Sequence, residues 1–296
     1  MLEIKLILCP IDFSEFSVRA YQHALSLAEH YRAKLVAQHV VELWRYPYAD
    51  YAASLGDYER FGQALREGGR EQLQEFVKNH THDRIQPELV VHEGIAPDSI
   101  LSFAQAQKTD VIVMGTHGRR GFDRLMLGSV TERVMRRAPC PVLAVGKPSH
   151  DSRAADEERH RPRHLSRILF CTDFSENSER ALHYAISATT EYDAELTLLH
   201  VLEEVSNPAK KDKAIAAAKA QLERLVPSEG RKPLKIKTAV RIGKPYEQII
   251  QLAVEAQIDM VAMAVHGRGA LDLAVFGSTT YRVLQLGPCP VLVVHV

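Results

Sequence analysis

Three absences limit what this chain of 296 residues can be. No apolar run reaches the roughly 18 residues that a membrane-spanning helix needs. Basic and acidic residues number 37 each, so the formal net charge is zero and no overall basic field attracts nucleic acid. The N-terminus, residues 1–12, has too short an apolar stretch and too early an acidic residue for a signal peptide. We therefore expect a cytoplasmic protein without a membrane or nucleic-acid function.

Cysteine is scarce, and its spacing matches neither a zinc site nor a redox motif. The four cysteines are Cys9, Cys140, Cys171 and Cys289. Cys140 and Cys289 each stand between two prolines before an apolar segment. The favoured interpretation is that they are small buried apolar side chains, and a disulfide or redox switch is the alternative. No metal site is expected.

The chain repeats itself at the length of a domain. The segment Asp-Phe-Ser-Glu at 12–15 returns at 173–176, and Pro-Cys-Pro at 139–141 returns at 288–290. This period is far longer than that of a solenoid repeat, and each copy is large enough for its own core. The sequence predicts a first domain over residues 1–148, a polar and charged linker over 149–165, and a second domain over 166–296.

Short apolar segments alternate with amphipathic ones in both copies. In the first copy we predict strands at 4–9, 34–41, 85–92, 111–115 and 141–145, and helices at 14–30, 57–80, 97–107 and 129–137. Ser129 with Glu132 predicts a capping box at the last helix. Continuously apolar strands between helices are typical of a parallel sheet covered on both faces. The expected fold class is α/β, with two tandem doubly wound, Rossmann-like domains of five parallel strands each.

A glycine-spaced loop follows the fourth predicted strand of each copy. In the first copy Gly115, Gly118 and Gly128 form the pattern G-x-x-G-x9-G, and Ser129 begins a helix. Glycine allows positive φ and close approach of a ligand, and backbone N–H groups at a helix start favour an anion. The pattern therefore predicts phosphate binding, with plain turn chemistry as the alternative. It matches neither the Walker nor the dinucleotide spacing.

Charged residues near this loop suggest further roles. Asp12 and Asp173 follow the first strand of each copy, where a carboxylate can accept a hydrogen bond from a ribose hydroxyl or an adenine amine. The alternative is a helix N-terminal carboxylate favoured by the dipole. Arg119 and two further arginines of the loop can neutralise phosphate charge, and a solvated basic loop is equally compatible with the sequence.

The second copy departs from the first at this loop. It keeps only Arg268 among the arginines, and Ala264 replaces Gly115, so an added methyl group crowds a close backbone contact. We expect its site to be the weaker one. The aromatic-rich segment 46–58, which belongs to the first copy, is either a lid or a partner surface.

Histidines recur in both copies, but no catalytic residue is predicted from them. His39, His117, His200 and His266 have no carboxylates at the short spacing of a metal or acid–base site. His39 and His200 lie in apolar strands, which favours hydrogen-bonded structural histidines.

These residues together resemble the universal stress protein family in its tandem form, over nearly the whole chain outside the linker. The resemblance is carried by residues 9–14, His39-Val40, Gly94 with Pro97, the glycine loop and residues 139–142. It implies ATP binding, with adenine and ribose contacts from Pro10, Asp12, Val40, Met114 and Gly115 and phosphate contacts from Gly118, Gly128, Ser129 and Val130. In the second copy the matching positions are Asp173, Val201, Met263, Gly267, Gly277, Ser278 and Thr279. Cys171 stands there in place of Pro10.

The function expected from the residues and the resemblance is that of an ATP-binding stress-response regulator, with ATP bound alone or with Mg²⁺ and at most slow hydrolysis. Two alternatives stay open: an interaction module of the same fold without nucleotide, and an ATP-consuming enzyme. The resemblance further implies that the last strands of the two domains pair, residues 142–145 with 292–295. Association of two chains into a homodimer is left open.

Overall fold

The computed structural model describes residues 3–43, 55–81, 85–118, 126–146, 165–203, 208–227, 234–265 and 277–295. Contacts divide the chain into two compact units: one comprises the described residues 3–145, and the other comprises Gly146 and the described residues 165–295. They are called the first and the second unit. The predicted linker lies outside the described residues, except for its last residue.

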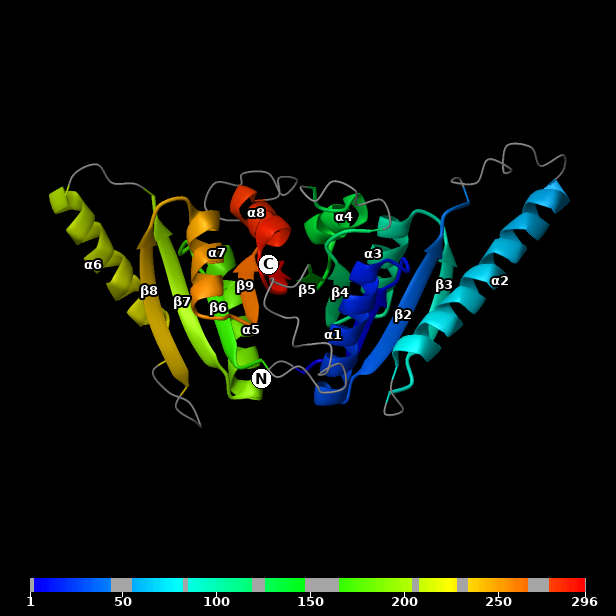
Figure 1. Ribbon diagram of the computed structural model, residues 1–296, viewed down its shortest axis with the longest axis horizontal. Helices are drawn as coiled ribbons and strands as arrows, with labels where there is room; N and C mark the ends of the chain where they lie inside the picture. The colour runs from blue at the N-terminus through cyan, green and yellow to red at the C-terminus, as the bar shows by residue number, and fades with distance from the viewer. Residues whose placement is uncertain are drawn as a thin grey trace. The chain divides into compact units, whose positions relative to one another are not determined.

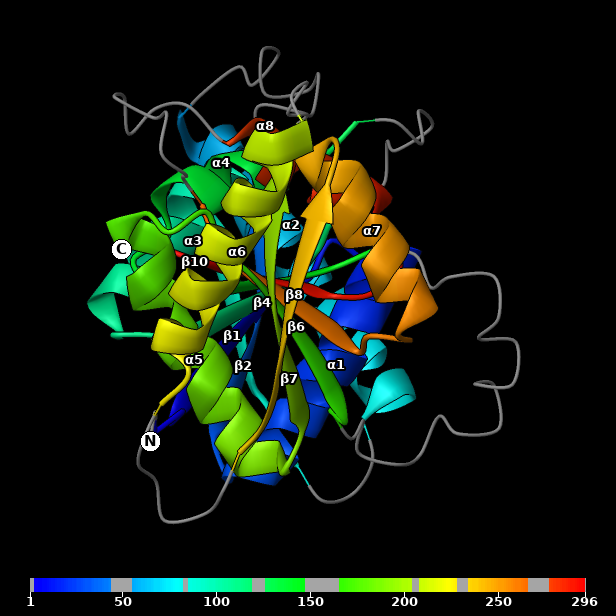
Figure 2. The ribbon, with the colours of Figure 1, turned by 90° about the vertical axis from the view of Figure 1, so that its left-hand side faces the viewer.

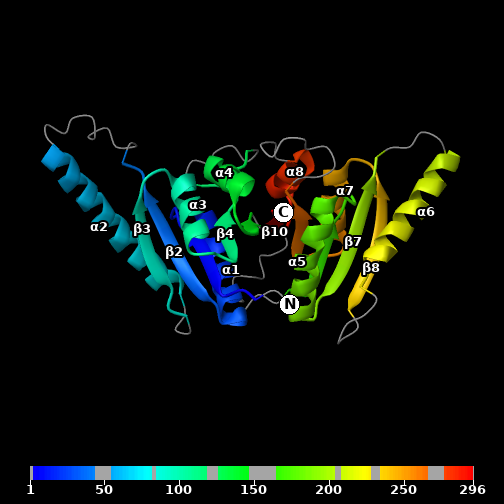
Figure 3. The ribbon, with the colours of Figure 1, turned by 180° about the vertical axis from the view of Figure 1, so that it is seen from behind.

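The first unit is a five-stranded parallel sheet with helices on both faces (Figures 1 and 3). Its elements are β1 (Leu6–Pro10), α1 (Glu15–Tyr31), β2 (Lys34–Val41), α2 (Leu55–His80), β3 (Glu88–Glu93), α3 (Ala96–Ala106), β4 (Val111–Gly115), α4 (Ser129–Arg137) and β5 (Val142–Val145). The strand order is β3-β2-β1-β4-β5, and every described pair is parallel. Helix α1 packs with α2, and α3 packs with α4.

The second unit repeats this arrangement. Its elements are β6 (Arg167–Cys171), α5 (Glu176–Tyr192), β7 (Glu195–Leu202), α6 (Pro208–Leu225), β8 (Lys235–Ile242), α7 (Pro245–Glu255), β9 (Met260–Ala264), α8 (Ser278–Leu286) and β10 (Val291–Val294). The strand order is β8-β7-β6-β9-β10, again parallel. In Figure 2, α5 and α6 lie on one face of this sheet and α7 lies on the other.

Both strand orders confirm the predicted doubly wound α/β fold. The chain winds outward from β1 to β3 and then returns to place β4 on the other side of β1, so the switch point lies between β1 and β4. In the second unit it lies between β6 and β9. Ligands of such sheets bind at this point, beyond the carboxyl ends of the strands.

The central strands are apolar along their length because helices cover both of their faces. Ile7 and Leu8 of β1, and Ile168 and Leu169 of β6, are fully buried. Removing a side chain of this size from water contributes about 1.5–3 kcal/mol. None of the helices that the structure describes combines the length and apolar composition of a membrane span.

Glycine recurs before α3 and α7 because of the backbone conformation at these two positions. Gly94 has φ of +145° and Gly243 has φ of +136°, a region that side-chain-bearing residues rarely adopt. Each glycine turns the chain from a strand into a helix with proline in its first turn. Glycine therefore recurs here to form a turn.

All four cysteines are free thiols, as the favoured interpretation predicts. Cys9, Cys140 and Cys171 are buried, and Cys289 is partly exposed. Burial raises the pKa of Cys140 and Cys289 to about 12. It also raises the pKa of Cys9 and Cys171. A raised pKa favours the protonated thiol over the reactive thiolate, and Cys9, Cys140 and Cys171 serve as core side chains.

Candidate functional site

The two sequence segments predicted to form a site meet at the switch point of the first unit. Strand β1 pairs with β4, with Leu8 opposite Ile112, so the segments that follow the two strands leave the same edge of the sheet. Asp12 follows β1, and Gly118 follows β4. The two residues are in contact, because a β-carbon added to Gly118 would stand 2.8 Å from Asp12 Oδ2.

The other carboxylate oxygen of Asp12 is bound to Ser14. Asp12 Oδ1 accepts the backbone N–H of Ser14 at 3.0 Å and its hydroxyl at 2.6 Å. Ser14 is also the N-cap of α1, and its hydroxyl oxygen accepts the N–H of Ser17 at 3.2 Å. Asp12 therefore lies outside α1, and Glu15 is the acidic residue in the first turn of this helix.

Between Asp12 and Ser14 the backbone adopts an unusual conformation. Phe13 has φ of 64°, in the left-handed region where a bulky side chain is strained. Its ring packs against His39, with centroids 4.5 Å apart, and against Phe76 of α2 at 5.9 Å. Sequence reasoning missed this residue, although the recurrence of Asp-Phe-Ser-Glu in both copies was a usable signal.

His39 is a structural histidine, as predicted. Its Nδ1 donates to the carbonyl oxygen of Ile11 at 2.8 Å, which ties β2 to the segment that carries Asp12. His200 makes the same bond to the carbonyl of Thr172 at 2.8 Å. Both histidines fix the backbone just before the aspartate.

Gly115, Gly118 and Gly128 provide space for neighbouring groups and do not adopt positive φ. Only Gly94 and Gly243 have positive φ among the described glycines. A β-carbon on Gly115 would stand 2.7 Å from Cβ of Phe16 in α1, so this glycine lets the helix approach β4. One on Gly128 would stand 3.3 Å from the carbonyl oxygen of Thr116.

Helix α4 begins directly beside the end of β4. Its N-cap is Gly128, whose N–H donates to the carbonyl oxygen of Thr116 at 2.9 Å. The predicted capping box is therefore wrong: Ser129 is the first helical residue, and Glu132 pairs with Arg136 at 2.6 Å. The hydroxyl of Thr131 donates to the carbonyl oxygen of Gly115 at 2.8 Å and fixes the helix start on the strand.

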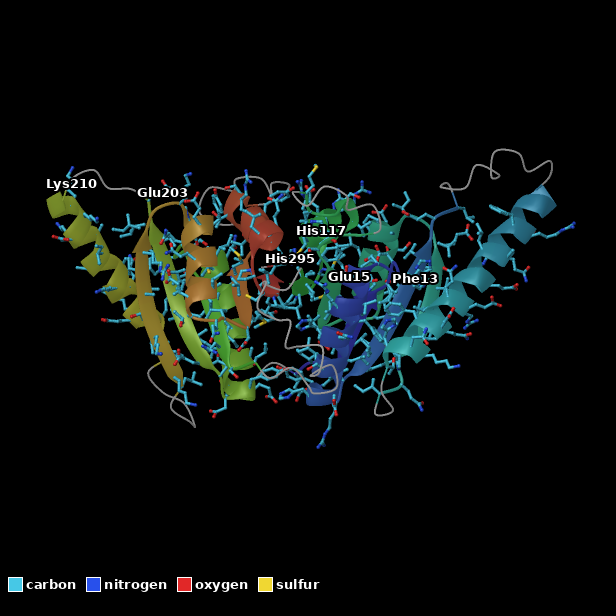
Figure 4. The ribbon with its side chains drawn as sticks, in the orientation of Figure 1. Phe13, Glu15, His117, Glu203, Lys210 and His295 are labelled. Atoms are coloured by element: carbon cyan, nitrogen blue, oxygen red, sulfur yellow. The ribbon has the colours of Figure 1, made fainter. Side chains whose placement is uncertain are left out.

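His117 stands between these parts. Its Nδ1 is hydrogen-bonded to the hydroxyl of Thr116 at 2.9 Å, and its ring lies 5.0 Å from that of Phe16. In the view of Figure 4, Phe13 lies toward α2, His117 lies toward α4, and Glu15 lies between them at the start of α1. No group of three or more His, Cys, Asp or Glu in the described part of the chain can hold a metal ion.

The remaining predicted residues of the first unit lie at the same sheet edge or outside the described residues. Pro10 ends β1 in register with Gln38, so Val40 stands two residues farther along the neighbouring strand. Met114 is buried near the end of β4. Arg119 lies outside the described residues. The aromatic-rich segment also lies outside them as far as residue 54.

The second unit repeats the site with small differences. Asp173 Oδ1 accepts the N–H of Ser175 at 3.0 Å and its hydroxyl at 2.6 Å, and Phe174 has φ of 59°. Gly277 is the N-cap of α8, and its N–H lies 3.3 Å from the carbonyl oxygen of Val265. Val201 lies in β7, Met263 in β9, and Ser278 and Thr279 begin α8. Gly267 lies outside the described residues.

Comparison with known proteins matches both units to one family. The model of the universal stress protein family matches residues 3–146 and 164–295. The universal stress protein MJ0531 of Methanocaldococcus jannaschii is 37% identical over 147 residues, which cover 50% of this chain and 85% of that protein. A universal stress protein of Mycolicibacterium smegmatis is 26% identical over 98% of this chain and 96% of its own length. A universal stress protein structure from Archaeoglobus fulgidus has the same fold, with a TM-score of 0.66 over 99% of both chains at 21% identity.

Proposed function

The chain belongs to the universal stress protein family, and we propose that its first unit binds an adenine nucleotide. ATP is the nucleotide we propose. Occupancy of this site would regulate the activity of the protein in the stress response. The observation that carries the proposal is the convergence of the Asp12 carboxylate, Gly118 and the N-terminus of α4 at the switch point of the sheet. The phosphates would lie at α4 and the ribose beside Asp12.

The start of α4 supports the phosphate part of this proposal. The first intrahelical hydrogen bond runs from the N–H of Glu132 to the carbonyl oxygen of Gly128, at 2.8 Å. The N–H groups of Ser129, Val130 and Thr131 precede it and point out of the helix end. Together with the positive end of the helix dipole, they favour an anion. Ser129 is exposed, so an anion can reach them.

The position of Asp12 supports the ribose part. A carboxylate only accepts hydrogen bonds at neutral pH, and a ribose hydroxyl is a suitable donor. Asp12 belongs to the β1 side of the switch point, where it neighbours Gly118, and α4 belongs to the β4 side. The proposal therefore puts the sugar, and not the phosphates, beside the negative carboxylate.

We propose that nucleotide binding has a regulatory role. A ligand that binds only the folded unit stabilises it by mass action, about 2.7 kcal/mol at a concentration of 100 times Kd. Turnover of ATP is proposed to be slow or absent, because the proposal assigns Asp12 to the ribose and not to a water molecule beside the phosphates.

We propose weaker binding in the second unit. The N–H of Gly277 lies 3.3 Å from its acceptor, against 2.9 Å for Gly128. The hydroxyl of Thr280 lies 3.2 Å from the carbonyl oxygen of Ala264, against 2.8 Å for the matching bond of Thr131. The start of α8 is therefore held less tightly against its strand than the start of α4.

Proline substitutions at the two helix starts test the proposal. Proline is tolerated at the first helical position, and the preceding Gly128 is already extended, with ψ of 137°. Ser129→Pro removes one N–H and the hydroxyl, Ser129→Ala removes only the hydroxyl, and Ser278→Pro is the matched control in the second unit. Calorimetric titration with ATP should show a loss of about 10-fold in the tighter site for Ser129→Pro, because hydrogen bonds to charged groups are strong.

Two results would contradict this assignment. Wild-type affinity in Ser129→Pro would show that α4 is not part of the site. Loss of the tighter site in Ser278→Pro would show that this site lies in the second unit. Mass spectrometry of the freshly purified, denatured protein then identifies the natural occupant as ATP, ADP or AMP.

A further inference from the structure

Ser14 has two separate hydrogen-bonding roles. As the N-cap of α1 its hydroxyl oxygen accepts the N–H of Ser17 at 3.2 Å. The same hydroxyl donates its proton to Asp12 Oδ1 at 2.6 Å, and the N–H of Ser14 reaches that oxygen at 3.0 Å. Capping needs only the first of these bonds. The other two act on the orientation of the Asp12 carboxylate.

The other carboxylate oxygen of Asp12 faces Gly118. A β-carbon added to Gly118 would stand 2.8 Å from Asp12 Oδ2. One oxygen is thus fixed by Ser14, and the second faces the loop that follows β4. The carboxylate cannot turn without breaking the bonds to Ser14.

The same arrangement recurs in the second unit. Ser175 caps α5, accepts the N–H of Ser178 at 3.2 Å and donates to Asp173 Oδ1 at 2.6 Å. Phe13 and Phe174 adopt left-handed backbone conformations between aspartate and serine in both units. Strain of this kind persists where the surrounding structure fixes it, and it concentrates at functional sites.

We propose that Ser14 is a positioning residue for the nucleotide: its hydroxyl holds the Asp12 carboxylate in the orientation that accepts a ribose hydroxyl. Ser14 acts through Asp12 and does not touch the nucleotide. The inference rests on the proposed nucleotide-binding function and names the part of the ligand, the sugar, that this pair recognises.

Three substitutions of Ser14 separate capping from positioning. Ser14→Thr keeps a capping oxygen and a donor to Asp12. Ser14→Asp keeps a strong N-cap but removes the donor, and Ser14→Ala removes both. Ser175→Asp is the matched control in the second unit. Thermal unfolding of each variant reports the capping role independently of ligand.

The readout is the ratio of affinities for ATP and for its 2′-deoxy and 3′-deoxy analogues. We expect the wild type and Ser14→Thr to prefer ATP over at least one analogue. Ser14→Ala and Ser14→Asp should each lose about 10-fold in affinity for ATP and much less for that analogue, so that the preference disappears. Ser175→Asp should leave the ratio of the tighter site unchanged.

A purely structural role gives a different pattern. If Ser14 only caps α1, Ser14→Asp binds ATP with the affinity of the wild type, or its affinities for ATP and for the analogues fall by the same factor. In both cases the ratio of these affinities stays constant. Either result overturns the inference and leaves nucleotide binding intact, as does a wild type without preference for the ribose hydroxyls. Absence of ATP binding by the wild type rejects the proposed function and the inference together.

Discussion

Asp12 Oδ2 faces Gly118 so closely that a β-carbon added to this glycine would stand 2.8 Å from the oxygen. This contact joins the segment after β1 to the segment after β4 across the switch point. It also means that a side chain at Gly118 displaces Asp12 before it meets any ligand. Variants of Gly118 therefore report on Asp12.

The first prediction concerns this coupling. Gly118→Ala should weaken ATP binding about 10-fold by moving the carboxylate, and Asp12→Ala should weaken it by a similar factor. The double variant should be little weaker than either single one, because both changes remove the same interaction. Calorimetric titration of the four proteins gives the coupling free energy. Additive losses would show that Gly118 acts on the ligand independently of Asp12.

The second prediction concerns Gly115. An added β-carbon would stand 2.7 Å from Cβ of Phe16 and 3.0 Å from its backbone carbonyl carbon, which cannot yield as a flexible side chain can. Gly115→Ala should therefore lower the free energy of unfolding by about 1–3 kcal/mol through overpacking. Urea unfolding measures it. Ala264→Gly is the matched change in the second unit, where Asn177 stands in place of Phe16, and it should cost about 0.5–1 kcal/mol through backbone entropy. An unchanged free energy of unfolding in Gly115→Ala would refute the packing role of this glycine.

The elements and the strand alternation could be predicted from sequence because they depend on local apolar patterns. Helix α4 and strand β4 have the predicted bounds, Ser129–Arg137 and Val111–Gly115. The roles of the glycines could not be predicted, because they depend on which distant segment lies opposite. Gly115 faces Phe16 of a helix about 100 residues earlier in the chain. The residues next to Gly115 in the sequence do not indicate this contact.

The site itself was predictable only in part, for the same reason. Asp12 and the glycine loop recur in both copies, which indicates a site, and the structure brings Asp12 and Gly118 together. The predicted helix at 14–30 begins at Ser14, which the structure shows to be the N-cap of α1, but its bond to Asp12 is invisible in a linear pattern. The left-handed conformation of Phe13 was equally hidden, since aromatic residues rarely adopt it.

The third prediction concerns the thiols. Burial raises the pKa of Cys140 from its ordinary 9.0 to about 12, so at pH 8 only about one thiol in 10⁴ is ionised. Native protein should therefore resist a disulfide exchange reagent at pH 8, whereas denatured protein should react at all four cysteines. Rapid labelling of the native chain, faster than its unfolding, would contradict this.

The same shift sets the sign of a pH effect on stability. Above pH 9.0 the unfolded chain releases thiol protons that the folded chain retains, because the folded pKa is the higher one. The free energy of unfolding should consequently fall as the pH rises from about 9 toward 12. Replacing Cys140 with alanine should reduce this slope, measured by urea unfolding at several pH values.

The last prediction uses two adjacent glycines of α2 that differ only in their surroundings. A β-carbon on Gly69 would stand 3.0 Å from Cγ2 of Val41 and 3.3 Å from Cδ2 of His39, while one on Gly68 would meet nothing within 4 Å. Val41 is a stiff β-branched residue, and His39 is fixed by its bond to Ile11, so neither can move cheaply. Gly68→Ala should stabilise the unit by about 1 kcal/mol through helix propensity.

Gly69→Ala gains the same propensity but loses about 1–3 kcal/mol to overpacking, so we expect a net destabilisation of up to about 2 kcal/mol. Urea unfolding of the two variants beside the wild type measures the difference. Because His39 also contacts Phe13, Gly69→Ala should additionally weaken ATP binding, whereas Gly68→Ala should not. Equal stabilisation by both alanines would show that α2 does not need glycine to approach β2.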